Sequence, residues 1–173
     1  MVETFEGIEP EDRGSLFIAW NAHVSGDVVL GKESSVWYSV TMRGDVGPIR
    51  IGDRTNIQDN SVCHVSTDNP LEIGNGVTVG HGVILHSCKI DDNCLIGMGA
   101  TVLDDVEIGR DSIVGAGSLV TKGKKFPPRS LILGNPAKLV KELTDEQVES
   151  INAYADRYIE NSKRTARNTK VSS

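Results

Sequence analysis

Residues 90–120 read IDDNCLIGMGATVLDDVEIGRDSIVGAGSLV, and an apolar residue stands at every sixth position of this stretch. These positions are occupied by Ile90, Ile96, Val102, Ile108, Val114 and Val120. An amphipathic helix repeats its apolar face every 3.6 residues and a half-buried strand every two, so a period of six fits neither. It fits a chain wound into a prism, in which each hexad is one short strand and one corner.

The same spacing extends towards the N-terminus with three interruptions. The further inward positions are Ile18, Val24, Leu30, Val36 and Met42, then Ile51, Ile57 and Cys63, then Ile73, Val79 and Leu85. Three hexads make one coil, so the inward residue of each hexad stacks on the residue three hexads further along. We therefore predict an all-β fold, a parallel β-helix of hexapeptide repeats with nearly six coils.

The ends of the repeat suggest the domain boundaries. The β-helix is predicted over residues 1–125, with repeats at about 18–122. The spacing then stops in a segment rich in lysine and proline, so residues 126–143 are predicted to be a connecting loop.

A C-terminal helix follows this loop. Thr144 and Gln147 form a capping box, which is typical of a helix start, and an apolar stripe continues from Val148. We predict a helix over residues 144–162, packed on the side of the prism. Residues 163–173 carry no pattern and are predicted to be a frayed tail.

Composition and charge limit the partners. The chain has 173 residues, about one domain's worth, and a net charge of -6, which disfavours a nucleic-acid partner. No run of about 18 apolar residues predicts a membrane span, and the acidic start does not resemble a signal peptide. Three cysteines without CxxC spacing do not predict a disulfide framework, so we expect a cytoplasmic protein.

Irregular hexads indicate where a site lies. Three hexads differ in length from the others, and all of them fall on one face of the prism: Met42–Ile51, Cys63–Ile73 and Leu85–Ile90. The residues that directly follow their inward positions are Arg43, His64 and His86, which should form a vertical column. Neighbouring coils lie about 4.8 Å apart, so two imidazoles in this column could share one metal ion.

His81 lies on another face of the prism, in register with Asp59 one coil away. It cannot easily reach His64 and His86 within one chain. A cyclic homotrimer would bring the Asp59 and His81 column of one subunit against the His64 and His86 column of the next.

Three histidines with an open fourth position are typical of catalytic zinc, which makes hydroxide available at neutral pH. Gln58 and Asp59 are placed to orient that hydroxide, and Arg43 with Asp45 could form an interface ion pair. Each histidine taken alone would be interpreted as a polar surface residue. The three histidines in this register favour a metal site.

These residues resemble the γ-class carbonic anhydrases and their close relatives over nearly the whole chain. The matching stretches are Arg43-Gly44-Asp45, residues 51–59, His64 and residues 79–86, extended by Gly97-Met98-Gly99-Ala100 and Gly134-Asn135-Pro136-Ala137. The resemblance implies a left-handed coil and hydration of CO₂ to bicarbonate by metal-bound hydroxide at a trimer interface. Such an enzyme is a carbonate dehydratase, a lyase.

The resemblance also implies roles for individual residues. His64 and His86 of one subunit and His81 of its neighbour would bind Zn²⁺, or Fe²⁺ or Co²⁺ in its place. Gln58 would position the hydroxide and Asn56 would hold Gln58. The remaining residues would be interface residues, namely Arg43, Asp45 and Asp59, and a pocket residue, Tyr158.

The sequence departs from the best-characterised members at two points. Val46 stands where they carry a Glu, and the loop of residues 65–70 is short and lacks their acidic residues. Weak activity is therefore expected. The alternatives are an acyl-CoA thioesterase or acyltransferase of the same fold, or a metal-binding scaffold without turnover; Cys63, Cys88 and Cys94 have no assigned role.

Overall fold

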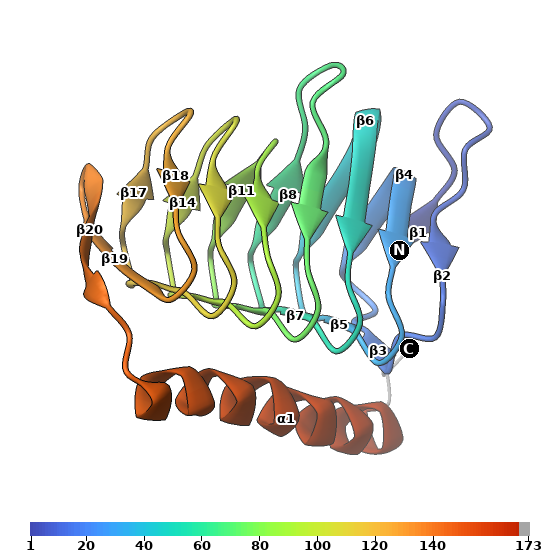
Figure 1. Ribbon diagram of the computed structural model, residues 1–173. Helices are drawn as coiled ribbons and strands as arrows, with labels where there is room; N and C mark the ends of the chain where they lie inside the picture. Colours follow the sequence, from blue (N-terminus) through green and yellow to red (C-terminus); the bar gives the residue numbers. More distant parts are fainter. Residues whose placement is uncertain (170–173) are drawn as a thin grey trace.

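The computed structural model describes residues 1–169, which form a parallel β-helix with one long helix along its side (Figure 1). The coil has three faces, and two of them join into a single 12-stranded sheet because β4 and β6 bend across the corner between them. The third face is a separate 8-stranded sheet. The predicted β-helix is confirmed.

The first face, which we call the apolar face, exposes the outward column Thr41, Val62, Ile84, Thr101 and Leu119. Its strands are β1 (Val2–Glu3), the first parts of β4 (His23–Leu30) and β6 (Thr41–Ile51), β8 (Val62–His64), β11 (Ile84–His86), β14 (Thr101–Val102) and β17 (Leu119–Val120).

The second face, which we call the charged face, exposes the column Arg50, Glu72, Lys89, Glu107 and Lys125. Its strands are β2 (Glu11–Asp12), the last parts of β4 and β6, β9 (Leu71–Ile73), β12 (Lys89–Ile90), β15 (Glu107–Ile108) and β18 (Lys125–Phe126).

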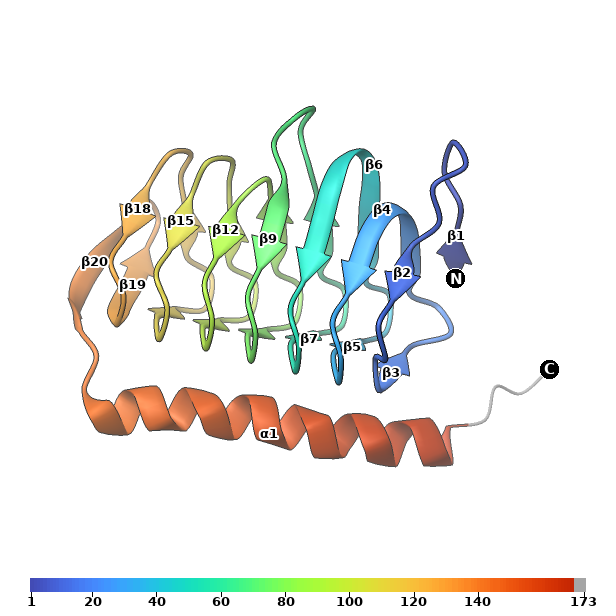
Figure 2. The same ribbon diagram turned by 45° about the vertical axis from the view of Figure 1, so that its right-hand side comes forward.

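The third face, which we call the helix face, is covered by α1 (Asp145–Asn168), which runs along the column (Figure 2). Its strands are β3 (Phe17–Ile18), β5 (Ser35–Val36), β7 (Asn56–Ile57), β10 (Thr78–Val79), β13 (Leu95–Ile96), β16 (Ile113–Val114), β19 (Ser130–Gly134) and β20 (Ala137–Glu142). All pair in parallel except β20, which pairs antiparallel with β19.

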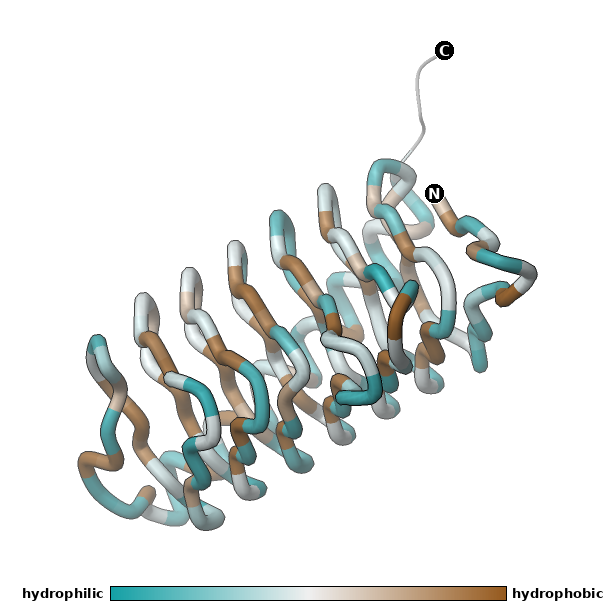
Figure 3. The backbone as a smooth tube through the Cα atoms, turned by 90° about the horizontal axis from the view of Figure 1, so that it is seen from above, coloured by the Kyte–Doolittle hydropathy of each residue, from teal (hydrophilic) through white to brown (hydrophobic). Residues whose placement is uncertain are grey.

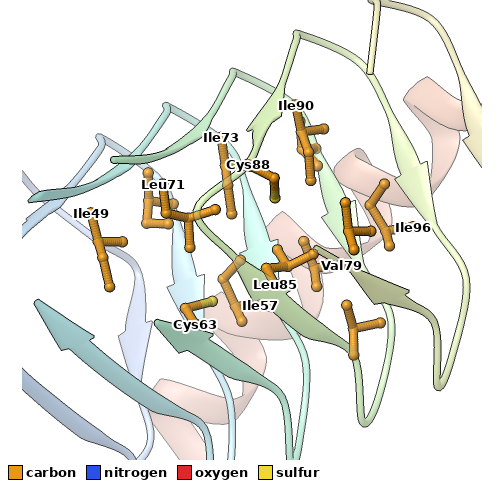
Figure 4. Close-up of a cluster of buried hydrophobic side chains, with 14 of the residues drawn as sticks. Ile49, Ile57, Cys63, Leu71, Ile73, Val79, Leu85, Cys88, Ile90 and Ile96 are labelled. Atoms are coloured by element: carbon orange, nitrogen blue, oxygen red, sulfur yellow. The ribbon is translucent and has the colours of Figure 1, made fainter. Parts of the chain in front are cut away.

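The core is a stack of the inward residues that the hexads predict. Each face contributes one column, and the pairing joins Val24, Met42, Cys63, Leu85, Val102 and Val120 on the apolar face. Figure 3 shows hydrophobic stretches recurring along successive coils, and Figure 4 shows their side chains filling the interior. Of the seventeen predicted inward residues, Ile18 alone is only partly buried, because it lies at the end of the stack.

Glycine has a steric role where coils stack closely. A Cβ on Gly52 would overlap the backbone of Gly74 on the next coil, and one on Gly31 would overlap Gly52. These glycines follow inward residues, where a side chain has no room.

The predicted loop at residues 126–143 is wrong. It contains the end of β18 and all of β19 and β20, so the helix face has seven parallel strands and the coil seven turns rather than nearly six. Phe126 and Ile132 continue the period of six, and both join inward columns.

The helix is longer than predicted. The capping box forms as expected, with the Thr144 hydroxyl accepting from the Gln147 N–H, and the helix ends at Asn168 rather than residue 162. Ile151, Ala155 and Ile159 of the predicted stripe are buried against the helix face. Residues 163–168 are therefore helical rather than frayed, and residues 170–173 lie outside the described part of the chain. No helix within residues 1–169 is long and apolar enough to cross a membrane.

Candidate metal and substrate site

Arg43, His64 and His86 form the vertical column that the irregular hexads predict. Arg43 pairs in register with His64, and His64 pairs in register with His86. All three lie where the apolar face turns into the charged face, and the longer connections of this corner project from the column in Figure 1. The strand register therefore brings two imidazoles together on adjacent coils.

The two imidazoles point nitrogen atoms at one another. His64 Nδ1 and His86 Nε2 are 3.1 Å apart, and the ring centroids are 5.1 Å apart. Two nitrogens bound to one tetrahedral zinc, each at 2.0–2.1 Å, stand about 3.3 Å from one another. The spacing of the pair thus fits two ligands of one metal ion.

Each imidazole is held from its other side by a carboxylate. His64 Nε2 lies 3.1 Å from Asp45 Oδ1, and His86 Nδ1 lies 2.5 Å from Asp104 Oδ1. A carboxylate that accepts the second ring N–H fixes the tautomer and orientation of a metal-binding histidine. Arg43 forms an ion pair with Asp45, so two of the column's three residues, Arg43 and His64, contact that carboxylate.

The two carboxylates are stabilised in their ionised form. Burial acts to raise the pKa of Asp45, but hydrogen bonds from His64, its own backbone N–H and Arg43 outweigh burial, and the net shift is downward. The pKa of Asp104 is also lowered, because hydrogen bonds from His86 and Ser66 outweigh its desolvation. Both groups can therefore act as acceptors at neutral pH.

Asp104 was not among the residues predicted from the hexad pattern. It lies one coil beyond His86, in the turn after β14, and is 23% exposed. The short connection between β11 and β12 shifts the register there, so Asp104 is not the residue that follows an inward position. The sequence feature that could have predicted Asp104 is an acidic residue one coil beyond a histidine at the same corner.

His81 lies at a different corner, where the helix face turns into the apolar face. Its Nδ1 is 2.8 Å from Asp59 Oδ2 one coil away, so the predicted neighbours do meet. Within residues 1–169 of one chain no three potential donor side chains gather around a single point. The structure thus brings His64 and His86 together and leaves His81 apart.

Gln58 is the last residue of a buried chain of hydrogen bonds. Its Nε2 donates to Asn56 Oδ1 at 3.0 Å, and Asn56 Nδ2 donates to Thr78 Oγ1 at 3.0 Å. Asn56 and Gln58 are buried on successive outward positions of β7 and the turn after it. Because Asn56 binds one Nε2 proton, the amide of Gln58 is fixed towards the cavity between α1 and the helix face.

Tyr158 reaches the same cavity from α1. The cavity has a volume of about 380 Å³, and its wall includes Gln58, His81 and Tyr158. The Tyr158 ring packs edge-on against Trp37 with centroids 5.3 Å apart. Burial and, secondly, the charge of Asp59 raise the pKa of Tyr158, so its hydroxyl stays protonated at neutral pH.

The three cysteines are free and buried. Burial raises the pKa of Cys63 and of Cys94 to about 12, and it also raises that of Cys88. A thiol needs to be ionised to act as a nucleophile or ligand, so the cysteines belong to the core rather than to the site.

Comparison with known proteins identifies the family. Residues 48–87 match the model of the hexapeptide repeat of succinyl-transferase, and residues 87–122 match the bacterial transferase hexapeptide model with six repeats. A carbonic anhydrase of Geobacillus kaustophilus is 49% identical over 92% of this chain and 88% of its own length. The mitochondrial gamma carbonic anhydrase 2 of Arabidopsis thaliana is 45% identical over 83% of this chain.

The chain belongs to the γ-class carbonic anhydrase family. This member spans only 54% of the plant relative's length. A solved Bacillus cereus structure, of the BC4754 gene product, matches the present family member with TM-score 0.95, 44% identity and 98% coverage of each chain. The hexapeptide model that matches residues 48–87 and the likeness to the two carbonic anhydrases both include the coils that carry His64, His81 and His86.

Proposed function

We propose that the chain is a metal-dependent carbonic anhydrase that hydrates CO₂ to bicarbonate as a homotrimer. The observation that carries the proposal is the pair of His64 Nδ1 and His86 Nε2 at 3.1 Å, with a carboxylate behind each ring. Hydrogen-bonded surface histidines would not need this double support. Two imidazoles preset on adjacent coils are suited to one Zn²⁺, with Fe²⁺ or Co²⁺ as substitutes.

The trimer is proposed from the apolar face. Its outward residues Val62 and Ile84 are 37% and 44% exposed in the single chain, and α1 packs on a different face. The His64 and His86 pair lies along one edge of this face and His81 along the other. If three copies pack their apolar faces around a threefold axis, each copy presents one edge to the opposite edge of its neighbour. His81 of one subunit would then complete the site of the next.

A bound metal supplies Lewis-acid activation, which lowers the pKa of a water molecule towards neutrality. The chain's own residues supply the remaining functions. Asp45 and Asp104 hold the two imidazoles, and the amide of Gln58, fixed by Asn56, orients water and substrate by hydrogen bonds. Tyr158 offers a protonated hydroxyl to the same cavity, and Arg43, Asp45 and Asp59 belong to the subunit contact.

Proton release is expected to be slow. Val46 is 45% exposed at the corner above the histidine pair and cannot carry a proton. Ser66 donates to Asp104 Oδ2 at 3.1 Å and His86 contacts Oδ1, so both oxygens of that carboxylate already have partners. We therefore expect CO₂ hydration to depend on buffer concentration, with imidazole buffers raising the rate.

The test is stopped-flow CO₂ hydration, with bound metal quantified on the same sample. In the His81→Ala variant we expect bound metal to fall and hydration to drop at least about 100-fold, because a ligand is lost. His23→Ala is the matched control, since His23 pairs with the exposed Glu3 at the N-terminal end. Full hydration by metal-free protein, or by the His81→Ala variant, would contradict the proposal.

A fully metallated trimer without CO₂ hydration would favour the other functions considered for this fold. Hydrolysis of acyl-CoA thioesters would identify a thioesterase, and a metal-independent response to acetyl-CoA would identify an acyltransferase. We place the protein in the cytoplasm, because its three cysteines are free thiols rather than disulfides.

A further inference from the structure

The cavity between α1 and the helix face is much larger than CO₂ requires. Its volume is about 380 Å³, which equals the volume of roughly 13 water molecules at about 30 Å³ each. One molecule of CO₂ occupies about the volume of two water molecules. A volume of this size falls in the range of pockets for small organic ligands. The shape alone therefore leaves room for a second kind of ligand.

The cavity wall contains one guanidinium and no carboxylate, although the Asp59 carboxylate lies behind it, 2.8 Å from the lining residue His81. The guanidinium is that of Arg157, which lines the cavity from α1. In a chain of net charge -6 this is an unusual wall. The Arg157 guanidinium lies 5.4 Å from the centroid of the Tyr154 ring, which holds it at the mouth of the cavity.

Arg157 has no salt-bridge partner within residues 1–169, although most arginines of the chain have one. Its neighbour on the helix, Asp156, pairs instead with Arg54 at 2.5 Å. A planar guanidinium with free N–H groups binds a carboxylate with two parallel hydrogen bonds. The geometry thus favours an anionic group at this end of the cavity.

Another part of the wall is apolar, beside the polar residues Gln58, Thr78, His81 and Asn161. Leu95 and Met98 line it from one turn of the β-helix and Ala116 from the next, opposite the rings of Tyr154 and Tyr158. Met98 is 60% exposed in the single chain and lies one coil beyond His81 at the same corner. An apolar body would lie between these residues and the tyrosine rings.

We propose that this cavity binds a small organic carboxylate with a short apolar body. Its carboxylate pairs with Arg157, and its hydrocarbon part lies against Leu95 and Met98. Neither bicarbonate nor CO₂ has such a body, so the site extends the chemistry of the protein beyond the CO₂ reaction. Its existence does not depend on CO₂ turnover.

The test is isothermal titration calorimetry of the full-length protein with hexanoate, acetate and the uncharged hexanamide. We expect hexanoate to bind at least tenfold more tightly than either comparator, because only hexanoate offers both charge and apolar length. Arg157→Gln should weaken hexanoate binding at least tenfold, and Arg157→Lys should restore part of it. Met98→Glu should also weaken binding, by placing a carboxylate in the wall.

Arg167→Gln is the matched control, because Arg167 is an exposed arginine in the last turn of the same helix. It should leave hexanoate binding unchanged. Equal binding of hexanoate and hexanamide would overturn the proposal. Hexanoate binding that survives Arg157→Gln but disappears after chelator treatment would place the carboxylate on a metal ion instead, and would overturn it equally.

Discussion

The apolar face and the charged face are made of the same short parallel strands with equally buried inward residues, yet their outward columns differ completely. Along the charged face the signs alternate from coil to coil, with Lys89 between Glu72 and Glu107, and Glu107 beside Lys125. Along the apolar face Val62 and Ile84 stand next to one another without a charge. Inward residues thus determine the coil, whereas outward residues determine what each face can meet.

The largest effect is expected from a charge on the apolar face. Ile84→Glu would bury an unpaired carboxylate in the proposed trimer contact, at a cost on the order of 3–5 kcal/mol. We expect the dissociation constant of the trimer to rise about 150- to 5000-fold, with loss of bound metal, because His81 no longer meets its neighbour's pair. Sedimentation equilibrium measures this change.

Lys89→Glu is the matched control on the charged face, where Lys89 is exposed. It should leave the oligomeric state unchanged. An Ile84→Glu protein that remains trimeric would show that the apolar face is not the contact.

The next effect separates two adjacent residues of one strand. Leu85 is fully buried, whereas its neighbour Ile84 faces outward. Leu85→Ala should lower the free energy of unfolding by about 2–5 kcal/mol, because it leaves a cavity in the stack. Chemical denaturation measures it, and oligomeric state should persist under native conditions. Similar losses of unfolding free energy for Leu85→Ala and for Lys89→Ala, at an exposed outward position, would contradict the division between inward and outward positions.

A smaller effect is expected behind the histidine pair. Asp104→Asn removes the carboxylate that holds His86, and such losses reduce metal affinity by about 10–100-fold. Competition with a fluorescent zinc chelator measures the affinity. Asp105→Asn is the control, because Asp105 pairs with Lys122 at the surface. Equal metal affinity of the Asp104→Asn variant and the unchanged protein would remove Asp104 from the site.

The smallest effect concerns the charged face itself. Glu107 and Lys125 form an exposed ion pair at 2.6 Å on adjacent coils. A double-mutant cycle with alanine at both positions should give a coupling of about 0.2–1 kcal/mol that decreases in high salt. A coupling above about 2 kcal/mol would mean that the face is not simply solvated.

The middle of the fold could be predicted from the sequence because burial acts at a fixed interval. Each inward residue stacks on the same position of the next coil, so one spacing specifies all three columns. The ends could not be predicted in the same way. The spacing of six continues to Phe126 and Ile132, but Pro127 and Pro128 between them are typical of a loop and led to that prediction.

The site divides in a similar way. His64, His86 and the Asp59–His81 pair follow from coil register, which the sequence contains. The position of Asp104 does not follow from the coil register, because the short connection after β11 shifts the register by one residue. Arg157 depends on where α1 docks against the helix face, and a capping box with an apolar stripe specifies the helix but not its position along the column.

The reversal of direction at β20 also ends the winding on the helix face. A parallel coil with an open last turn offers unpaired backbone groups, on which another chain could continue the winding into a filament. β20 occupies that edge and runs the opposite way, with the exposed Lys138 and Lys141 on it. On the helix face a further coil cannot pair with β20 in the parallel sense, so this face cannot continue the winding into a polymer.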